Sequence, residues 1–337
     1  YGYDKRLATG VIAASGTLAQ IIPPSLVLII MADQLGKSVG DMYTGAFVPG
    51  MVLTLLYVLY VVIVSFVKPQ WVPALPPAAR SLRGARLMLR VLTSLLPPLL
   101  LIFLVLGTIF LGIATPTEGG AMGATGALIM AIVRKRLNLK LLKQAMESTA
   151  KLTSFVVFIL IGARLFSLTF YGVDGHRWVE HLLSDLPGGQ VGFLIVVNLL
   201  VFFLAFFLDY FELSFIVIPL LGPVAEKLGI DLIWFGVLLA VNMQTSFLHP
   251  PFGFALFFLR SVAPASVKSS DIYWGAIPFV CIQIIMIGLV IAFPQMVTFG
   301  LDKGPTVDAN TIQIEIPVYE YDNSEPPPSV EPPAEAK

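Results

Sequence analysis

Long apolar runs separated by short polar segments fill most of this 337-residue chain. About 20 consecutive apolar residues are enough to cross a bilayer as an α-helix. We therefore expect spanning helices at 42–67, in a run that ends near 113, and at 152–172. Apolar sequence also resumes after a Gly-rich interruption and continues to Val133. The pattern predicts an all-α polytopic membrane protein.

Two apolar runs match each other at a distance of 227 residues. Each begins with a Gly-x-Asp signal, at 2–4 and at 229–231, and each reaches a double proline, at 23–24 and at 250–251. Proline removes a backbone donor and clashes with the preceding turn, so each run is expected to form a broken helix. Repeated broken helices are typical of secondary transporters, which bind ions and substrate at the breaks.

A second match follows each broken helix and extends the repeat. The segment 41–46 reads DMYTGA and the segment 271–276 reads DIYWGA, at an offset of 230. More than 200 residues precede the second double proline, whereas only 22 precede the first. If the chain is duplicated, we expect an N-terminal part to be missing from this sequence.

Basic residues gather in two segments, which fixes an expected topology. The loop 68–88 carries Lys68, Arg80, Arg83 and Arg86 without an acid, and a second basic loop runs through 134–143. The positive-inside rule places both loops in the cytoplasm. Counting crossings then places the polar segments 32–41 and 173–189 outside.

The segment 190–227 decides the orientation of the second broken helix. If it spans once, both broken helices run in the same direction; if it is a re-entrant hairpin, they form an inverted repeat. The polar interruption 208–212 halfway along and Gly222-Pro223 after it favour the hairpin. A turn at membrane depth is tolerable where protein or a water-filled cavity covers it.

These observations divide the chain into five parts. Its last part has eight acids, two lysines and many prolines, so we expect a disordered tail on the outer side. Residues 1–67 hold the first broken helix with its following helix, and residues 68–88 form the cytoplasmic basic loop. Residues 89–189 hold the scaffold helices of the second repeat, and residues 190–300 hold the hairpin, the second broken helix and the last helix. Residues 301–337 form the tail.

Composition agrees with a membrane protein and excludes several classes of function. Only 12% of the residues are charged, against about 25% in soluble domains. The single cysteine excludes an intrachain disulfide, and three scattered histidines argue against a histidine metal site. We see no nucleophile–base pair, metal cluster or phosphate loop, so an enzyme is disfavoured. The expected surroundings are a lipid bilayer, with no nucleic-acid partner.

The first break offers oxygen ligands near the middle of the membrane. Carbonyls freed by the double proline, with nearby hydroxyls, suit a small cation, and the half-helix beyond the prolines favours an anion such as a carboxylate. The candidate cation ligands are Ser15, Gly16 and Pro24, and the candidate substrate contacts are Thr17 and Ser25. The alternative is a proline kink in which the hydroxyls bond back to the preceding turn.

The second break is more polar. Its candidate cation ligands are Thr245, His249 and Gly253, and its candidate substrate contacts are Gln244 and Ser246. Amides in an apolar helix need partners, because unsatisfied amides in hydrocarbon cost several kcal/mol. His249 is either a proton carrier or a neutral hydrogen-bonding residue at the break.

Other polar residues interrupt apolar runs. Asp209 is a candidate cation ligand or the cap of the second hairpin arm. For Arg164 three roles are open. It attracts a substrate carboxylate, it pairs with Asp209 or Glu212, or it faces a partner subunit or a lipid headgroup. Thr115 followed by Glu118 predicts a capping box, which favours a structural role.

Taken in order, several segments resemble the large membrane subunit of the tripartite ATP-independent periplasmic (TRAP) transporters. The resemblance extends over nearly the whole chain up to about residue 300, and the combination of segments is specific. The segments that carry it are 14–17, 22–25, 112–118, 219–225, 228–231 and 242–253.

The resemblance implies a fold and a function. It implies an inverted-repeat, elevator-type transporter with broken helices and a re-entrant hairpin, in the bacterial inner membrane. Such a protein imports an organic acid with Na⁺ as the coupling ion and without an organic cofactor. A periplasmic solute-binding protein delivers the substrate, and a small four-helix membrane subunit is the partner. The family more usually has threonine where His249 stands, and a backbone carbonyl ligand would survive that change.

Two other functions compete with this one. The first is a stand-alone sodium- or proton-coupled anion carrier that works without a binding protein. The second is a membrane scaffold or an integral-membrane enzyme, although a scaffold has no need of duplicated broken helices. Uptake measurements on the intact system separate all three.

Overall fold

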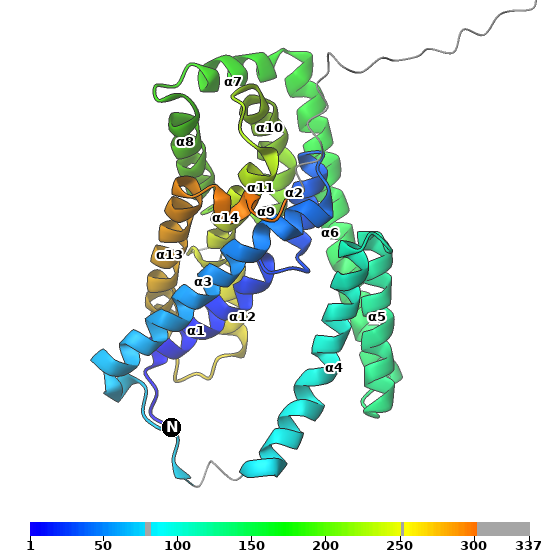
Figure 1. Ribbon diagram of the computed structural model, residues 1–337, viewed down its shortest axis with the longest axis vertical. Helices are drawn as coiled ribbons and strands as arrows, with labels where there is room; N and C mark the ends of the chain where they lie inside the picture. Colours follow the sequence, from blue (N-terminus) through cyan, green and yellow to red (C-terminus); the bar gives the residue numbers. More distant parts are fainter. Residues whose placement is uncertain (78–81, 251–252, 302–337) are drawn as a thin grey trace, which may run out of the picture. The chain divides into compact units, whose positions relative to one another are not determined.

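The computed structural model describes residues 1–77, 82–250 and 253–301. All regular elements in this part of the chain are helical (Figure 1). Four helices are long and apolar enough to cross a membrane, which confirms a polytopic all-α protein. They are α3 (Val39–Val67), α4 (Gly84–Phe110), α6 (Leu139–Gly172) and α13 (Ser269–Ala292). The predicted tail, 301–337, lies outside the described residues beyond Leu301.

The first broken helix is present as predicted. It consists of α1 (Lys5–Thr17), the short 3₁₀ turn η1 (Leu18–Gln20) and α2 (Leu26–Gln34). The Asp4 carboxylate accepts hydrogen bonds from the first amides of α1, and the Ser25 hydroxyl accepts one from Leu28 in α2. These caps satisfy amides that have no partner inside a helix.

The second broken helix has the same order of elements. It consists of α11 (Leu232–Met243), the 3₁₀ segment η5 (Gln244–Leu248) and α12 (Phe254–Val262). Asp231 caps α11, 227 residues after Asp4 caps α1. Both second halves, α2 and α12, are nine residues long. The sequence repeat therefore corresponds to a repeat of structural elements.

The two copies pack against each other reciprocally. Helix α1 lies along α13, the last long helix of the second copy, and α11 packs on α3, the long helix of the first. The α1–α13 contact depends on small residues, because a Cβ on Gly275 would lie 2.1 Å from the Arg6 carbonyl oxygen. A Cβ on Gly10 would in turn lie 2.1 Å from the Gly275 carbonyl oxygen.

Helices α4 and α5 (Pro116–Val133) pack mainly on each other (Figure 1). The capping box predicted at Thr115 and Glu118 begins α5, which confirms its structural role. The Arg134 guanidinium at the end of α5 donates to the Thr93 carbonyl of α4 over 2.8 Å. Most of α4 is exposed, so its apolar faces are available to lipid or to other protein segments.

Helix α6 corrects the prediction for the second basic loop. We predicted a helix from about 152, but α6 begins at Leu139, where Asn138 caps it through a 2.7 Å bond from the Leu141 amide. The prediction was wrong because it followed the apolar run, and the first turns of α6 are polar. Lys143 and Glu147, one turn apart, form an ion pair there at 3.8 Å.

The segment 173–227, predicted as a polar segment followed by a hairpin with a turn, contains additional helices. Helix α7 (Gly175–Ser184) occupies the polar segment, and the predicted hairpin contains α8 (Gly189–Leu204) and a second arm. That arm is α9 (Tyr210–Glu212), the π-helical η4 (Leu213–Val217) and α10 (Ile218–Lys227). Lys227 donates to Glu180 of α7 over 2.5 Å, and this contact lowers the pKa of the Glu180 carboxyl.

The remaining elements are short. The 3₁₀ turn η2 (Pro69–Trp71) follows α3, and α14 (Gln295–Thr298) follows α13. Helix α14 packs on α3, so the end of the second copy lies against the first.

The glycine contact between α1 and α13 gives a stability prediction. Gly275→Ala in the full-length permease forces the two helices apart and lowers the free energy of unfolding by about 1–3 kcal/mol, as overpacking does. Thermal unfolding of the purified protein measures the change. Gly288→Ala on the same helix is the control, because nothing lies within 4 Å of its added methyl. Equal melting temperatures for the two variants would contradict the prediction.

Candidate ion and substrate site at the two helix breaks

The two helix breaks contact each other directly. The Gln244 side-chain amide, at the start of η5, donates to the Thr17 carbonyl oxygen over 3.0 Å and lies 3.2 Å from the Thr17 hydroxyl. Both residues are buried, and they are 227 residues apart, which is the offset of the repeat. The structure therefore joins equivalent positions of the two copies, at two of the predicted substrate contacts.

Buried amide oxygens remain beside this contact. Asn242 donates its amide to the carbonyl and side-chain oxygens of Asn198 in α8, over 2.7 and 2.9 Å. The side-chain oxygens of Asn242 and Gln244 are buried and have no hydrogen-bond partner among the residues that the structure describes. Buried polar atoms normally have a partner, so these oxygens can accept a cation or a donor from a ligand.

Gly253 brings two backbone carbonyls close together. A Cβ at this position would lie 2.8 Å from both the Phe247 and the His249 carbonyl oxygens. An added Cβ would displace both carbonyls, so this close approach, here called the glycine cradle, requires a glycine. The His249 carbonyl also accepts from the Gly253 amide over 2.6 Å. Carbonyl oxygens are the ligands that hard cations prefer, and unwound helices supply them in transporters.

The hydroxyls of both breaks donate to their own helices. Thr245 donates to the Asn242 carbonyl over 2.7 Å, and Ser246 donates to the Met243 carbonyl over 2.7 Å. Ser15 donates likewise to the Ile12 carbonyl over 3.2 Å, on the exposed side of α1 beside Gly16. These are the bonds of the kink alternative, but each hydroxyl oxygen keeps lone pairs that can still accept.

His249 lies in an aromatic contact with the first hairpin arm. Its ring stacks on Phe206 with centroids 4.1 Å apart and meets the edge of Phe202 at 4.6 Å. The side chain is buried, and neither ring nitrogen has a hydrogen-bond partner within the described part of the chain. The His249 side chain thus connects the second break to the hairpin by packing.

Asp209 and Glu212 form a capping box at the second hairpin arm. The Glu212 amide donates to the Asp209 carboxylate over 2.9 Å, and the Asp209 amide donates to Glu212 over 3.0 Å. The capping alternative for Asp209 is therefore confirmed. Both residues also line a cavity of about 240 Å³ together with Ser246 and Phe254. Two carboxylates and a hydroxyl make this cavity favourable for a cation.

A larger cavity, of about 490 Å³, lies on the side of the first break. Gly16, Thr17 and Gln20 line it together with Phe247 and Phe254 of the second break. Apolar walls with a few polar groups are typical of sites for small organic ligands. Phe254, the first residue of α12, lines both cavities, so the two cavities lie next to each other at this residue.

The structure does not bring every predicted residue to this place. Arg164 lines a different cavity, of about 730 Å³, with Asp33 and Tyr171, and forms no ion pair in the described part of the chain. The Ser25 hydroxyl is occupied as a cap and as a donor to the Gln20 carbonyl. Pro24 is exposed at the first break.

Two residues at the site escaped the sequence analysis. Asn198 holds Asn242, and the Tyr210 hydroxyl donates to the Val27 carbonyl of α2 over 2.5 Å, joining the hairpin to the first broken helix. A lone Asn in the apolar run of α8 was a usable signal. Tyr210 carried none, because tyrosines are common at the ends of apolar segments.

A known family of transporter components matches most of this chain. The family profile described as "Tripartite ATP-independent periplasmic transporter, DctM component" matches residues 1–296. The sialic acid TRAP transporter permease protein SiaT of Haemophilus influenzae is 31% identical over 88% of this chain and 47% of its own length.

Two C4-dicarboxylate TRAP transporter large permease proteins, both named DctM, are also similar. The protein of Pseudomonas aeruginosa is 29% identical over 88% of this chain and 67% of its own length, and that of Vibrio cholerae is 30% identical over 91% and 71%. The chain thus spans about half of the Haemophilus permease and about two thirds of the others. Because the profile covers nearly every described residue, the chain belongs to the DctM component family of the TRAP transporters.

Proposed function

We propose that this protein carries out sodium-coupled uptake of an organic acid across the bacterial inner membrane. A periplasmic solute-binding protein delivers the acid, and a small four-helix membrane subunit completes the system. The observation that carries the proposal is the hydrogen bond from Gln244 to Thr17, which joins equivalent positions of two broken helices. Family membership supports the binding protein and the small subunit as partners.

The contact between equivalent residues supports an inverted repeat. When two copies are related by a pseudo-two-fold axis, residues that touch their own equivalents lie beside that axis. The reciprocal packing of α1 on α13 and of α11 on α3 has the same origin. In transporters built this way, one structural unit moves as a body and exposes a central site to each side in turn, as in an elevator.

Sodium is proposed to bind mainly at the second break. The Phe247 and His249 carbonyls beside Gly253, the Gln244 side-chain oxygen and the Thr245 hydroxyl are hard oxygen donors. The Asp209 carboxylate adds negative charge in the adjoining cavity. The first break, through Ser15, Gly16 and the Pro24 backbone, is proposed as the weaker half-site.

The organic acid is proposed to occupy the larger cavity beside Thr17 and Gln20. The amino terminus of α12 has no side-chain cap, whereas Ser25 caps that of α2. Uncapped amides and the helix dipole favour a carboxylate at α12. A sodium ion in the cavity on the other side of Phe254 would strengthen that attraction. The relatives named for sialic acid and C4-dicarboxylates support a carboxylate substrate.

The first experiment tests the function itself. The intact permease with its small subunit, reconstituted in liposomes, is expected to take up the organic acid only with a sodium gradient and the binding protein outside. Uptake that persists without sodium would refute sodium coupling. Uptake without the binding protein would instead establish the stand-alone carrier.

The Gln244 contact gives a second prediction. Gln244→Ala leaves the Thr17 carbonyl without its donor, which costs about 1–3 kcal/mol when the group stays buried. We expect sodium-driven uptake to fall by about tenfold or more. The control is Gln144→Ala, an exposed position on α6. Uptake by Gln244→Ala equal to that of the control would show that the contact between the breaks is dispensable.

The glycine cradle gives a third prediction. Gly253→Ala places a methyl group 2.8 Å from two carbonyl oxygens and displaces these proposed sodium ligands. The sodium concentration for half-maximal uptake is expected to rise by about tenfold, in line with the loss of one or two ligands. Gly288→Ala provides the matched glycine control. An unchanged sodium dependence in Gly253→Ala would place the ion elsewhere.

A further inference from the structure

A groove far from the helix breaks combines two cations with a wall of aromatic rings. It has a volume of about 360 Å³ and lies between α1, α3, α13 and the turn after α3. Arg6 of α1 and Lys68 at the end of α3 supply its charges. Tyr60, Trp71 and Trp274 supply its rings. The transport mechanism proposed above uses none of these residues.

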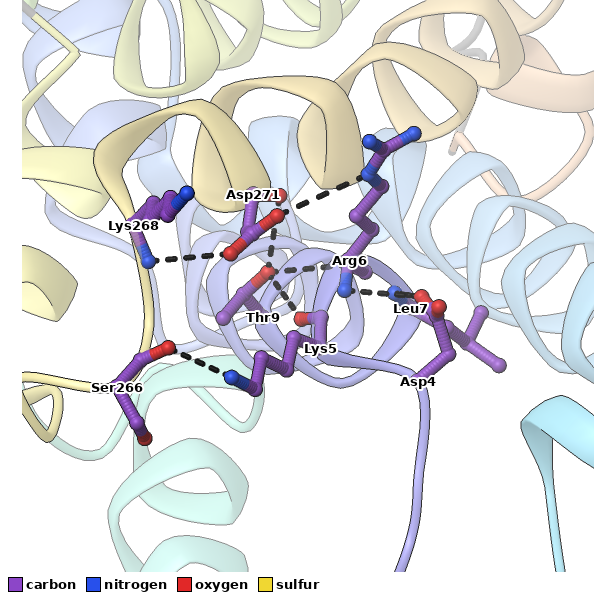
Figure 2. A network of polar contacts seen from close by, with 8 residues as sticks. All are labelled: Asp4, Lys5, Arg6, Leu7, Thr9, Ser266, Lys268 and Asp271. Carbon is purple, nitrogen blue, oxygen red and sulfur yellow. Dashed lines mark hydrogen bonds and ion pairs between the residues drawn. The ribbon is translucent and has the colours of Figure 1, made fainter.

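The Arg6 guanidinium is only partly engaged. Its Nε lies 3.8 Å from the Asp271 carboxylate, while the terminal nitrogens point away from the polar network that joins α1 to α13 (Figure 2). The other Asp271 oxygen accepts from the Lys268 amide over 3.1 Å. The Arg6 side chain is 58% exposed, so its fork of donors remains available to a ligand.

The second cation is held differently. The Lys68 ammonium lies over the Trp71 ring, 3.9 Å from its centre, and has no ion-pair partner in the described part of the chain. No acidic residue lines the groove among the residues described there. Lys5, next to Arg6, donates instead to the Ser266 carbonyl (Figure 2). Asp271 therefore offsets part of the Arg6 charge, whereas the Lys68 charge has no carboxylate partner in the described part of the chain.

Exposed apolar and aromatic side chains line the groove. Val67 is 70% and Trp274 is 60% exposed, and both lie on apolar helices. Tryptophan and tyrosine concentrate at membrane–water interfaces. The loop that begins at Lys68 is the basic segment that the positive-inside rule places in the cytoplasm. The groove is thus expected at the headgroup level of the inner leaflet.

We propose that this groove binds the phosphate headgroup of an anionic phospholipid. The Arg6 fork matches two phosphate oxygens, and Lys68 adds a second charge from the opposite wall. An acyl chain follows the exposed apolar side chains of Ile63 and Val67 along α3. Basic pockets between transmembrane helices on the cytoplasmic side have the right chemistry for such headgroups. The bound lipid bridges α1, α3 and α13.

The test compares lipid retention by charge variants. The full-length permease is purified from mixed vesicles of phosphatidylglycerol and phosphatidylcholine, and the lipids that remain bound are measured by native mass spectrometry. Arg6→Gln with Lys68→Gln is expected to reduce the preference for phosphatidylglycerol by about tenfold. Arg6→Lys with Lys68→Arg keeps the charges and is expected to retain most of the preference. Thermal unfolding confirms that each variant is folded.

A matched pair on the second basic segment controls for general attraction to the membrane. Arg136→Gln with Lys140→Gln also removes one arginine and one lysine at exposed positions and is expected to leave the preference unchanged. Equal loss in both pairs, or no loss in the Arg6 and Lys68 pair, would overturn the proposal. Glycerol phosphate is the competitor: displacement of the lipid at millimolar glycerol phosphate would show a site for free phosphates instead.

Discussion

A helix that is broken at membrane depth leaves backbone groups without partners, and in hydrocarbon each such group costs several kcal/mol. This chain meets that constraint with side chains from other segments. Gln244 donates to the Thr17 carbonyl, and Tyr210 donates to the Val27 carbonyl. The Tyr43 hydroxyl donates to the Ser25 carbonyl over 3.3 Å. The first broken helix is thereby stabilised by the second copy, by the hairpin and by the long helix α3 that follows it.

The same constraint makes the two breaks unequal. At the first, the Ser25 hydroxyl caps α2 and donates to the Gln20 carbonyl, and Tyr43 donates to the Ser25 carbonyl. At the second, the amide oxygens of Asn242 and Gln244 stay without partners in the described residues, and two backbone carbonyls approach Gly253 closely. The unpartnered buried amide oxygens at the second break argue for the principal cation site there.

Local signals in the sequence predicted the elements well. The double prolines marked the breaks, and Asp4 and Asp231 stood where each broken helix begins. The beginning of α6 was missed because polar residues can continue a helix into water, where a count of apolar residues no longer detects it. Capping at Thr115 was predictable because both partners lie within one turn.

Tertiary pairing was beyond the same signals. In the sequence, Arg164 and Gln244 are both polar residues inside apolar runs. In the structure, Arg164 lines a separate cavity, whereas Gln244 contacts the first break. Which polar residue faces which depends on how helices far apart in the chain pack. The offset of 227 was nevertheless a usable clue, because residues related by a pseudo-two-fold axis can contact only if they lie beside it.

Packing around the glycines bears on how the proposed transport cycle can work. Close backbone contact at Gly10 and Gly275, with the Arg6–Asp271 network, ties the first broken helix to the last long helix of the second copy. The breaks, their flanking helices and the two cavities therefore belong to one tightly packed unit. Helices α4 and α5 contact it little. A central site can move relative to its surroundings without losing its ligands only if those ligands move together, and the packing of this unit meets that requirement.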